Sequence, residues 1–191
     1  MRKEIILLVL SLMQSVSLSS AVWGMPGFDS EDADVVRSSQ RLVSPPEISD
    51  SQNSHSNGIG IVSSSAQTLT RSTFNAGSTI AIHANDVSFG HSSIKGREGI
   101  SIKADNNLAI TDSTISSRKG SVKLSSKNTS LADISVTAKE NIQSSATNTH
   151  AMVRSTFEAD GFTSVYGKHI FLDPSSNIEG REGVILEEIN N

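Results

Sequence analysis

The sequence predicts an all-β protein: a single-stranded, right-handed parallel β-helix of about six coils with a repeat of about 21 residues. Three observations predict this fold. A short polar pair followed by a large apolar residue recurs from residue 58 onward. Between these recurrences, apolar residues alternate with the period of a strand. Helical periodicity is sustained nowhere in this region. Together these features indicate a solenoid built from short strands.

The apolar members of the repeat lie at nearly constant spacing. Their separations are 20, 21, 21, 21 and 21 residues, which is the expected signature of stacked structural repeats. Large apolar residues also recur five positions earlier in most coils. We therefore expect both positions to face a continuous core. The six recurring apolar residues are Phe74, Ile94, Ile115, Val136, Phe157 and Ile178.

Within each repeat, the local pattern predicts short strands joined by turns. Residues 80–84, 100–104 and 122–125 alternate between apolar and polar or small side chains, so each places one face inward. Ala84 and Ala104 are small, which allows a coil to bend around a narrow, filled interior. Glycine, asparagine, aspartate and serine separate the strands, as tight turns require.

The regions that precede the repeats predict an exported chain with a polar leader. Residues 1–24 have two basic residues and then a short apolar run, the pattern of a secretory signal peptide, with cleavage expected before Val22 or Met25. The apolar run is shorter than a membrane span of about 20 residues. Residues 25–57 are acidic, proline-containing and polar, which predicts a disordered leader. The β-helix domain is then expected over residues 58–191.

Composition excludes several classes of protein. The chain has no cysteine, so it contains neither disulfides nor thiolate metal sites. Its formal net charge is −4, whereas a dedicated nucleic-acid-binding protein presents a basic face. No segment after the predicted signal is apolar enough to cross a membrane as a helix. We expect a chain stabilised by core packing and backbone pairing, with no cofactor and no nucleic-acid partner.

The repeats resemble those of filamentous-haemagglutinin-like adhesins and autotransporter passengers. The clearest examples are residues 99–104 with 108–111, and residues 120–124. The resemblance covers about residues 58–186 and does not include a translocator domain. It implies a secreted or surface-displayed bacterial protein that adheres to host or neighbouring cells.

One predicted column of stacked side chains contains the candidate site residues. It includes Asp112 and Asp133, with His91 and Arg154 beside them. Two stacked carboxylates are candidate calcium ligands, and with the neighbouring base and cation they are also a loose match to β-helix polysaccharide lyases and hydrolases. The favoured interpretation is an ordinary surface ladder, in which His91 and Arg154 relieve the repulsion between the two acids.

A column of hydroxyl residues runs beside these candidates. It is flanked by charged or mixed columns, so we expect hydrogen bonding along the stack and not a flat ice-binding face. The five histidines do not share a column, which argues against a zinc cluster. The hydroxyl residues are Thr73, Ser93, Thr114, Ser135 and Thr156.

Three functional hypotheses follow from the sequence. The first is a non-enzymatic, adhesin-like interaction protein that binds a host or cell-surface protein or glycan through one face of the rod. The second is a periplasmic structural or assembly protein that self-associates through the ends of its coils. The third is a small carbohydrate-active enzyme that uses Asp112 and Asp133. The expected location is secreted or at the cell surface, with the periplasm as the alternative.

Overall fold

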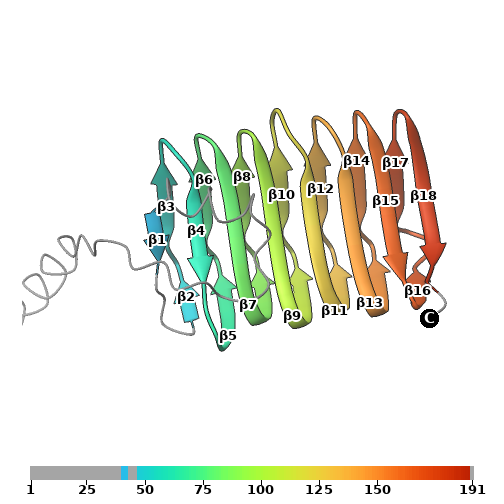
Figure 1. Cartoon of the computed structure of the whole chain (residues 1–191), viewed down its shortest axis with the longest axis horizontal. Helices are drawn as coiled ribbons and strands as arrows, with labels where there is room; N and C mark the ends of the chain where they lie inside the picture. Colours follow the sequence, from blue (N-terminus) through green and yellow to red (C-terminus); the bar gives the residue numbers. More distant parts are fainter. Residues whose placement is uncertain (1–39, 43–46, 190–191) are drawn as a thin grey trace, which may run out of the picture.

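The computed structural model describes residues 40–42 and 47–189, and this part of the chain winds into a parallel β-helix of about seven turns (Figure 1). The predicted all-β solenoid with a spacing of about 21 residues is therefore confirmed. The predicted signal peptide, residues 1–24, lies outside the described residues. In the described ranges, no helix is long and apolar enough to cross a membrane.

One wall of the rod is a short sheet in which each coil contributes four residues. All its strands pair in parallel and in register, so the recurring apolar residues stack directly from Phe74 to Ile178. Its strands are β3 (Gln52–His55), β6 (Thr73–Ala76), β8 (Ser93–Gly96), β10 (Thr114–Ser117), β12 (Ser135–Ala138), β14 (Thr156–Ala159) and β17 (Asn177–Gly180).

The rest of each coil belongs to a long, bent sheet that also pairs in parallel. In Figure 1, β4, β15 and β18 of this sheet run opposite to the strands of the short sheet. Its strands are β1 (Gln40–Leu42), β2 (Glu47–Ser49), β4 (Ile59–Val62), β5 (Ala66–Thr70), β7 (Thr79–Gly90), β9 (Gly99–Thr111), β11 (Val122–Ala132), β13 (Ile142–Val153), β15 (Phe162–Gly167), β16 (His169–Leu172) and β18 (Gly183–Glu188).

The long strands join two segments that the sequence predicts as separate strands. In β7 the segment 80–84 continues into 86–90 through a shift in register between Ala84 and Asp86. In β4 and β5 the same two segments are separate strands. The irregularity bends the sheet at this point and directs its two halves along different walls of the coil.

Side chains that point inward fill the rod with a continuous apolar core. Phe74, Ile94, Ile115, Val136 and Phe157 are completely buried, as their spacing predicts. The apolar residues five positions earlier are also buried, at Leu69, Phe89, Ile110, Leu131 and Met152. Each coil thus adds a layer of apolar side chains, and this layer packs against the layers of the adjacent coils.

Glycine is required where adjacent coils approach most closely. A β-carbon on Gly120 would lie 1.5 Å from the carbonyl oxygen of Glu98, and one on Gly77 would lie 1.9 Å from that of Ser56. Any side chain at these turns would therefore collide with the backbone of the preceding coil.

The first described coil includes residues that composition assigns to the polar leader. β2 pairs with β5 and β3 pairs with β6, so residues 47–55 form a coil in front of residue 58. Ile48 packs against the core, but Gln52 and Ser54 are exposed. A mainly polar segment is ordered here because its backbone pairs with the next coil, which composition alone does not reveal. This coil explains why the turns number about seven instead of six.

Candidate functional site

The predicted candidate residues lie in one turn that repeats along the rod, between the long sheet and the short sheet. Six successive coils each place one residue there in the left-handed region of backbone space. The residues and φ angles are Asp50 (52°), Arg71 (46°), His91 (53°), Asp112 (46°), Asp133 (55°) and Arg154 (45°). Aspartate and histidine adopt this conformation more readily than most residues, whereas arginine does so less readily.

A buried serine stabilises this turn immediately after the left-handed residue. The hydroxyl of Ser92 donates to the carbonyl of Gly90 at 3.0 Å and accepts the N–H of Ser72 at 3.2 Å. The Ser113 hydroxyl accepts the N–H of Ser92 at 3.0 Å in the same way. The serine therefore provides hydrogen-bond partners for the backbone N–H and C=O groups of the turn. The side chain of the left-handed residue before it points out of the rod.

Two of the turn residues form bidentate ion pairs with their equivalents one coil earlier. Arg71 donates to both carboxylate oxygens of Asp50, at 2.6 and 2.8 Å, and Arg154 donates to those of Asp133, at 2.7 and 2.6 Å. The hydrogen bond from Arg154 holds the pKa of Asp133 below its ordinary value, and that from Arg71 does the same for Asp50. These geometries are the planar forks that arginine forms with carboxylates.

The structure places Asp112 and Asp133 in adjacent coils, flanked by His91 and Arg154 as the sequence predicts. The His91 Nε2 atom lies 3.6 Å from Asp112 Oδ2, and both oxygens of Asp133 already accept hydrogen bonds from Arg154. Within the described ranges, no three metal-binding side chains cluster. This arrangement favours the surface ladder over a calcium site, because Asp133 has an arginine on both of its oxygens.

The same arrangement gives little support to hydrolysis by the two acids. General acid–base catalysis by two carboxylates needs one of them with a raised pKa, usually through burial. Asp133 is instead held with a lowered pKa in an exposed ion pair.

The predicted hydroxyl column lies on the outer face of the short sheet. Thr73 and Ser93, for example, are in register and half-buried at its surface. The hydrogen bonds described along the stack come mainly from the buried serine column one residue earlier. In the column two residues further on, Thr137 donates to Ser116 at 2.9 Å.

Sequence reasoning missed a ladder of amide side chains at the bend of the long sheet. Asn107 donates to Asp86 at 2.7 Å, Asn128 donates to Asn107 at 3.1 Å, and Asn148 donates to Asn128 at 2.8 Å. The spacings of 21, 21 and 20 residues were the available signal. All three hydrogen bonds point the same way along the rod.

A buried polar pair inside the rod was also missed. His150 is completely buried, and its Nε2 atom lies 2.6 Å from the hydroxyl oxygen of Ser144, which is also completely buried. Its Nδ1 atom has no hydrogen-bond partner among the described residues. Burial lowers the pKa of His150 to about 4, so the imidazole is neutral at ordinary pH.

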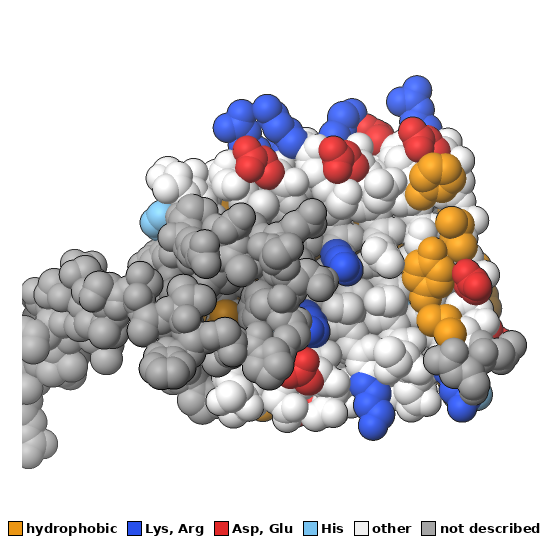
Figure 2. All heavy atoms as spheres, in the orientation of Figure 1, with side chains coloured by type: hydrophobic (Ala, Val, Ile, Leu, Met, Phe, Trp, Pro, Cys, Tyr) orange, Lys and Arg blue, Asp and Glu red, His pale blue; other side chains and the backbone are white. Residues whose placement is uncertain are grey.

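Charged side chains gather along a second turn, which leads from the short sheet back to the long sheet. Figure 2 shows this edge as a row of basic and acidic side chains along the top of the rod. Lys139 and Asp160 form an ion pair there between adjacent coils, and Ser78 donates to Glu98 at 2.7 Å.

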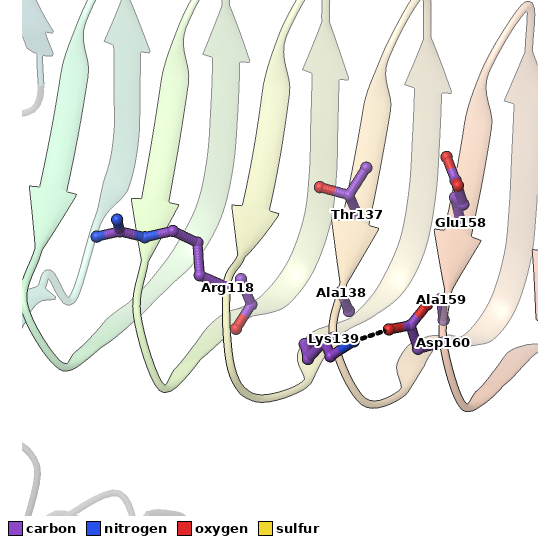
Figure 3. A pocket seen from close by; sticks show the side chains of 8 residues that line it. Arg118, Thr137, Ala138, Lys139, Glu158, Ala159 and Asp160 are labelled. Atoms are coloured by element: carbon purple, nitrogen blue, oxygen red, sulfur yellow. Dashed lines mark hydrogen bonds and ion pairs between the residues drawn. The ribbon is translucent and has the colours of Figure 1, made fainter.

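Beside this row is a shallow depression of about 200 Å³ (Figure 3). Ligand pockets for small molecules usually have volumes of about 300–1,000 Å³, so this hollow is smaller than a typical active-site cleft. Its lining residues are Ser117, Arg118, Thr137, Ala138, Lys139, Glu158, Ala159 and Asp160.

Comparison with known proteins adds no relative to this description. No protein family, curated protein or solved structure matches the chain. The structure therefore defines a class of fold, the parallel β-solenoid, and a fold of this kind does not by itself specify a function.

Proposed function

We propose that the chain is an exported, non-enzymatic interaction protein that binds a ligand on a cell surface in the manner of an adhesin. Recognition is assigned to the outer face of the short sheet and the charged turns beside it. The observation that carries this proposal is the exact register of the short sheet, which holds its outward side chains in fixed columns.

Preorganised columns favour binding because little conformational entropy is lost when a ligand contacts them. The central columns of this face carry hydroxyls and mixed polar groups, such as Thr114 and Ser116. These groups suit hydrogen bonding to a polar ligand over an extended area.

Two further observations support binding over catalysis. The candidate acid Asp133 is occupied by an arginine, and the depression beside the face is small. Export rests on the sequence of residues 1–24, and the resemblance to adhesin repeats supports display at a surface.

Binding to intact cells tests the proposal. Fluorescently labelled mature chain is titrated onto candidate cells, and saturable binding that unlabelled chain displaces is expected. Thr114→Arg, in the centre of the short sheet, is expected to reduce this binding about tenfold by steric block. Ser130→Arg is the matched control, because Ser130 is an exposed hydroxyl residue on the long sheet. Equal loss in both variants, or no saturable binding, would contradict the assignment.

Fractionation of the native cells tests the location independently. The mature chain is expected in the medium or at the outer surface, accessible to added protease. Finding the mature chain only in the periplasm would contradict the proposed adhesive function.

A second candidate, assembly through the ends of the coils, is favoured by one specific observation. The exposed large apolar residues of the described chain all belong to its later coils, and Figure 2 shows a cluster of them over β15 and β18. Size-exclusion chromatography over a range of concentrations separates the two candidates, since assembly predicts larger species at higher concentration. These residues are Val153, Phe162, Phe171, Leu172, Val184, Ile185 and Leu186.

A further inference from the structure

Several charged residues of this rod face an opposite charge one coil away. Arg71 pairs with Asp50, Arg154 with Asp133, and Lys139 with Asp160, each across 21 residues. The same holds for His91 with Asp112 and for His83 with Asp105. Opposite charges in adjacent strands and turns favour the stack, and like charges disfavour it.

Arg97 and Arg118 are instead like charges stacked on one another. The N–H of Arg118 donates to the carbonyl of Gly96 at 3.1 Å, and that of Lys119 donates to Arg97 at 2.7 Å, so the two turns stack directly. Arg97 and Arg118 therefore occupy equivalent positions in adjacent coils, and both side chains are exposed. In the part of the chain that the structure describes, neither guanidinium forms an ion pair.

The acidic groups nearby do not pair with these two arginines. Glu98 accepts a hydrogen bond from the hydroxyl of Ser78, and Asp160 forms an ion pair with Lys139. Figure 3 shows the Arg118 side chain pointing away from the Lys139–Asp160 pair, toward the preceding coils. Lys95, exposed on β8 two residues before Arg97, adds a third cation.

We propose that Lys95, Arg97 and Arg118 form a binding site for closely spaced phosphate groups. This inference rests on the proposed function and names the chemistry of the surface ligand.

The geometry of a β-helix suits phosphate at this place. Adjacent coils lie about 4.8 Å apart, so one phosphate group can contact both guanidinium groups, or two neighbouring phosphates can take one each. Arginine forms bidentate hydrogen bonds with phosphate oxygens, and Lys95 supplies a further charge. A phosphate carrying nearly two charges offsets the like-charge repulsion better than a single carboxylate.

The test measures the binding of sodium tripolyphosphate to the full mature chain by isothermal titration calorimetry. Saturable binding that weakens with added salt is expected. Arg118→Asp places a carboxylate opposite Arg97, the same kind of pair that Asp133 forms with Arg154, so the melting temperature is expected to rise. The affinity for tripolyphosphate is expected to fall about 10- to 100-fold. Loss of binding in a more stable protein cannot be attributed to unfolding.

Two variants complete the experiment. Arg118→Lys keeps the charge and is expected to retain binding within about tenfold, the difference reflecting the lost bidentate contact. Lys127→Gln removes an exposed cation elsewhere, on β11, and is expected to leave the affinity unchanged. Undetectable binding by the unmodified chain, or equal affinity in Arg118→Asp, would overturn the proposal.

Vesicles distinguish the source of the phosphate. Binding to phosphatidylcholine vesicles that contain phosphatidic acid, abolished in Arg118→Asp, identifies a lipid headgroup, whereas binding to tripolyphosphate alone identifies a phosphate-bearing polymer or soluble group. If cells fail to bind the chain but tripolyphosphate binds, the adhesive function fails and the phosphate site stands. If cells bind and tripolyphosphate does not, the phosphate site fails alone.

Discussion

The interiors of the earlier coils, formed by β7 and β9, and of the later coils, formed by β11 and β13, differ although their backbones pair in the same way. One inward column runs Ile61, Ile82, Ile102 and Leu124, then changes to Ser144 and returns to an apolar residue at Val165. A second starts at the buried Gln67, continues through Val87 and Leu108, and then changes to Thr129 and His150. In these two columns, β7 and β9 carry only aliphatic side chains, whereas β11 and β13 also carry hydrogen-bonded polar groups.

This difference shows that the β-helix does not require a uniform apolar core. Polar side chains are accepted where they pair inside, as Ser144 does with His150 and Ser126 does with Thr129 at 2.7 Å. The later coils therefore depend on hydrogen bonds and on a neutral imidazole in addition to apolar packing, whereas the coils of β7 and β9 depend on packing alone in these columns.

The largest expected effect is a cavity in the earlier coils. Ile102→Ala removes most of a completely buried side chain and is expected to lower the free energy of unfolding by about 2–5 kcal/mol. Urea denaturation followed by circular dichroism measures it. Ser101→Ala, the outward neighbour on the same strand, is the control and is expected to change stability by less than about 0.5 kcal/mol. Equal effects would mean that the packing of this coil is not decisive.

The pH dependence of the later coils is expected to come next in size. The pKa of His150 is about 4 in the folded chain and 6.5 in the unfolded chain, so the unfolded chain binds the proton more readily. The contribution of the neutral His150 to the free energy of unfolding is fully present above pH 6.5. It is lost as the pH falls toward 4, by at most about 3 kcal/mol. Urea denaturation at a series of pH values measures this loss.

Two variants isolate the contribution of His150. His150→Leu is expected to flatten the pH profile between 6.5 and 4. His91→Gln, at an exposed histidine, is expected to preserve it. An unchanged slope in His150→Leu would contradict the assignment of this acid sensitivity to the buried imidazole.

Breaking the buried pair from its other side is expected to have a smaller effect. Ser144→Ala leaves the Nε2 atom of His150 without its hydrogen-bond partner, which costs about 1–3 kcal/mol. The double variant Ser144→Ala with His150→Leu leaves no unpaired imidazole and is expected to be more stable than the sum of the single changes predicts. Strict additivity in this double-mutant cycle would show that the two side chains are not coupled.

The smallest effect is expected at the exposed turn, where solvent screens the charges. Asp133→Asn removes the carboxylate that accepts both hydrogen bonds from Arg154, so the melting temperature is expected to fall slightly, and less so in high salt. Because the pKa of Asp133 is lowered by Arg154, this contribution is present above pH 3.8 and is lost below it, a window separate from that of His150. A large decrease that persists in high salt would place the role of Asp133 elsewhere.

The repeat made most of the fold predictable from the sequence. A spacing of 21 residues located Phe74, Ile94 and Ile115, all of which are completely buried and stacked. The same spacing correctly placed His91 beside Asp112, because equivalent positions of adjacent coils must be neighbours.

Other features were not predictable because their signals are weak or depend on three dimensions. The coil at residues 47–55 is ordered by pairing with β5 and β6, although its composition is polar. The inward orientation of His150 follows from a register shift between Ser126 and Asn128, which moves Thr129 and His150 into one column. The stacking of Arg97 on Arg118 requires knowing how two turns align.

The register between coils also determines how the chain folds. Each pairing joins residues about 21 apart in sequence, so every new coil closes only a short loop on the one already formed. Folding of such a chain starts wherever a few coils are stable together and then proceeds to their neighbours. The aliphatic coils of β7 and β9 are the natural starting point, and the coils around His150 are expected to be added later and to be the first to unravel in acid.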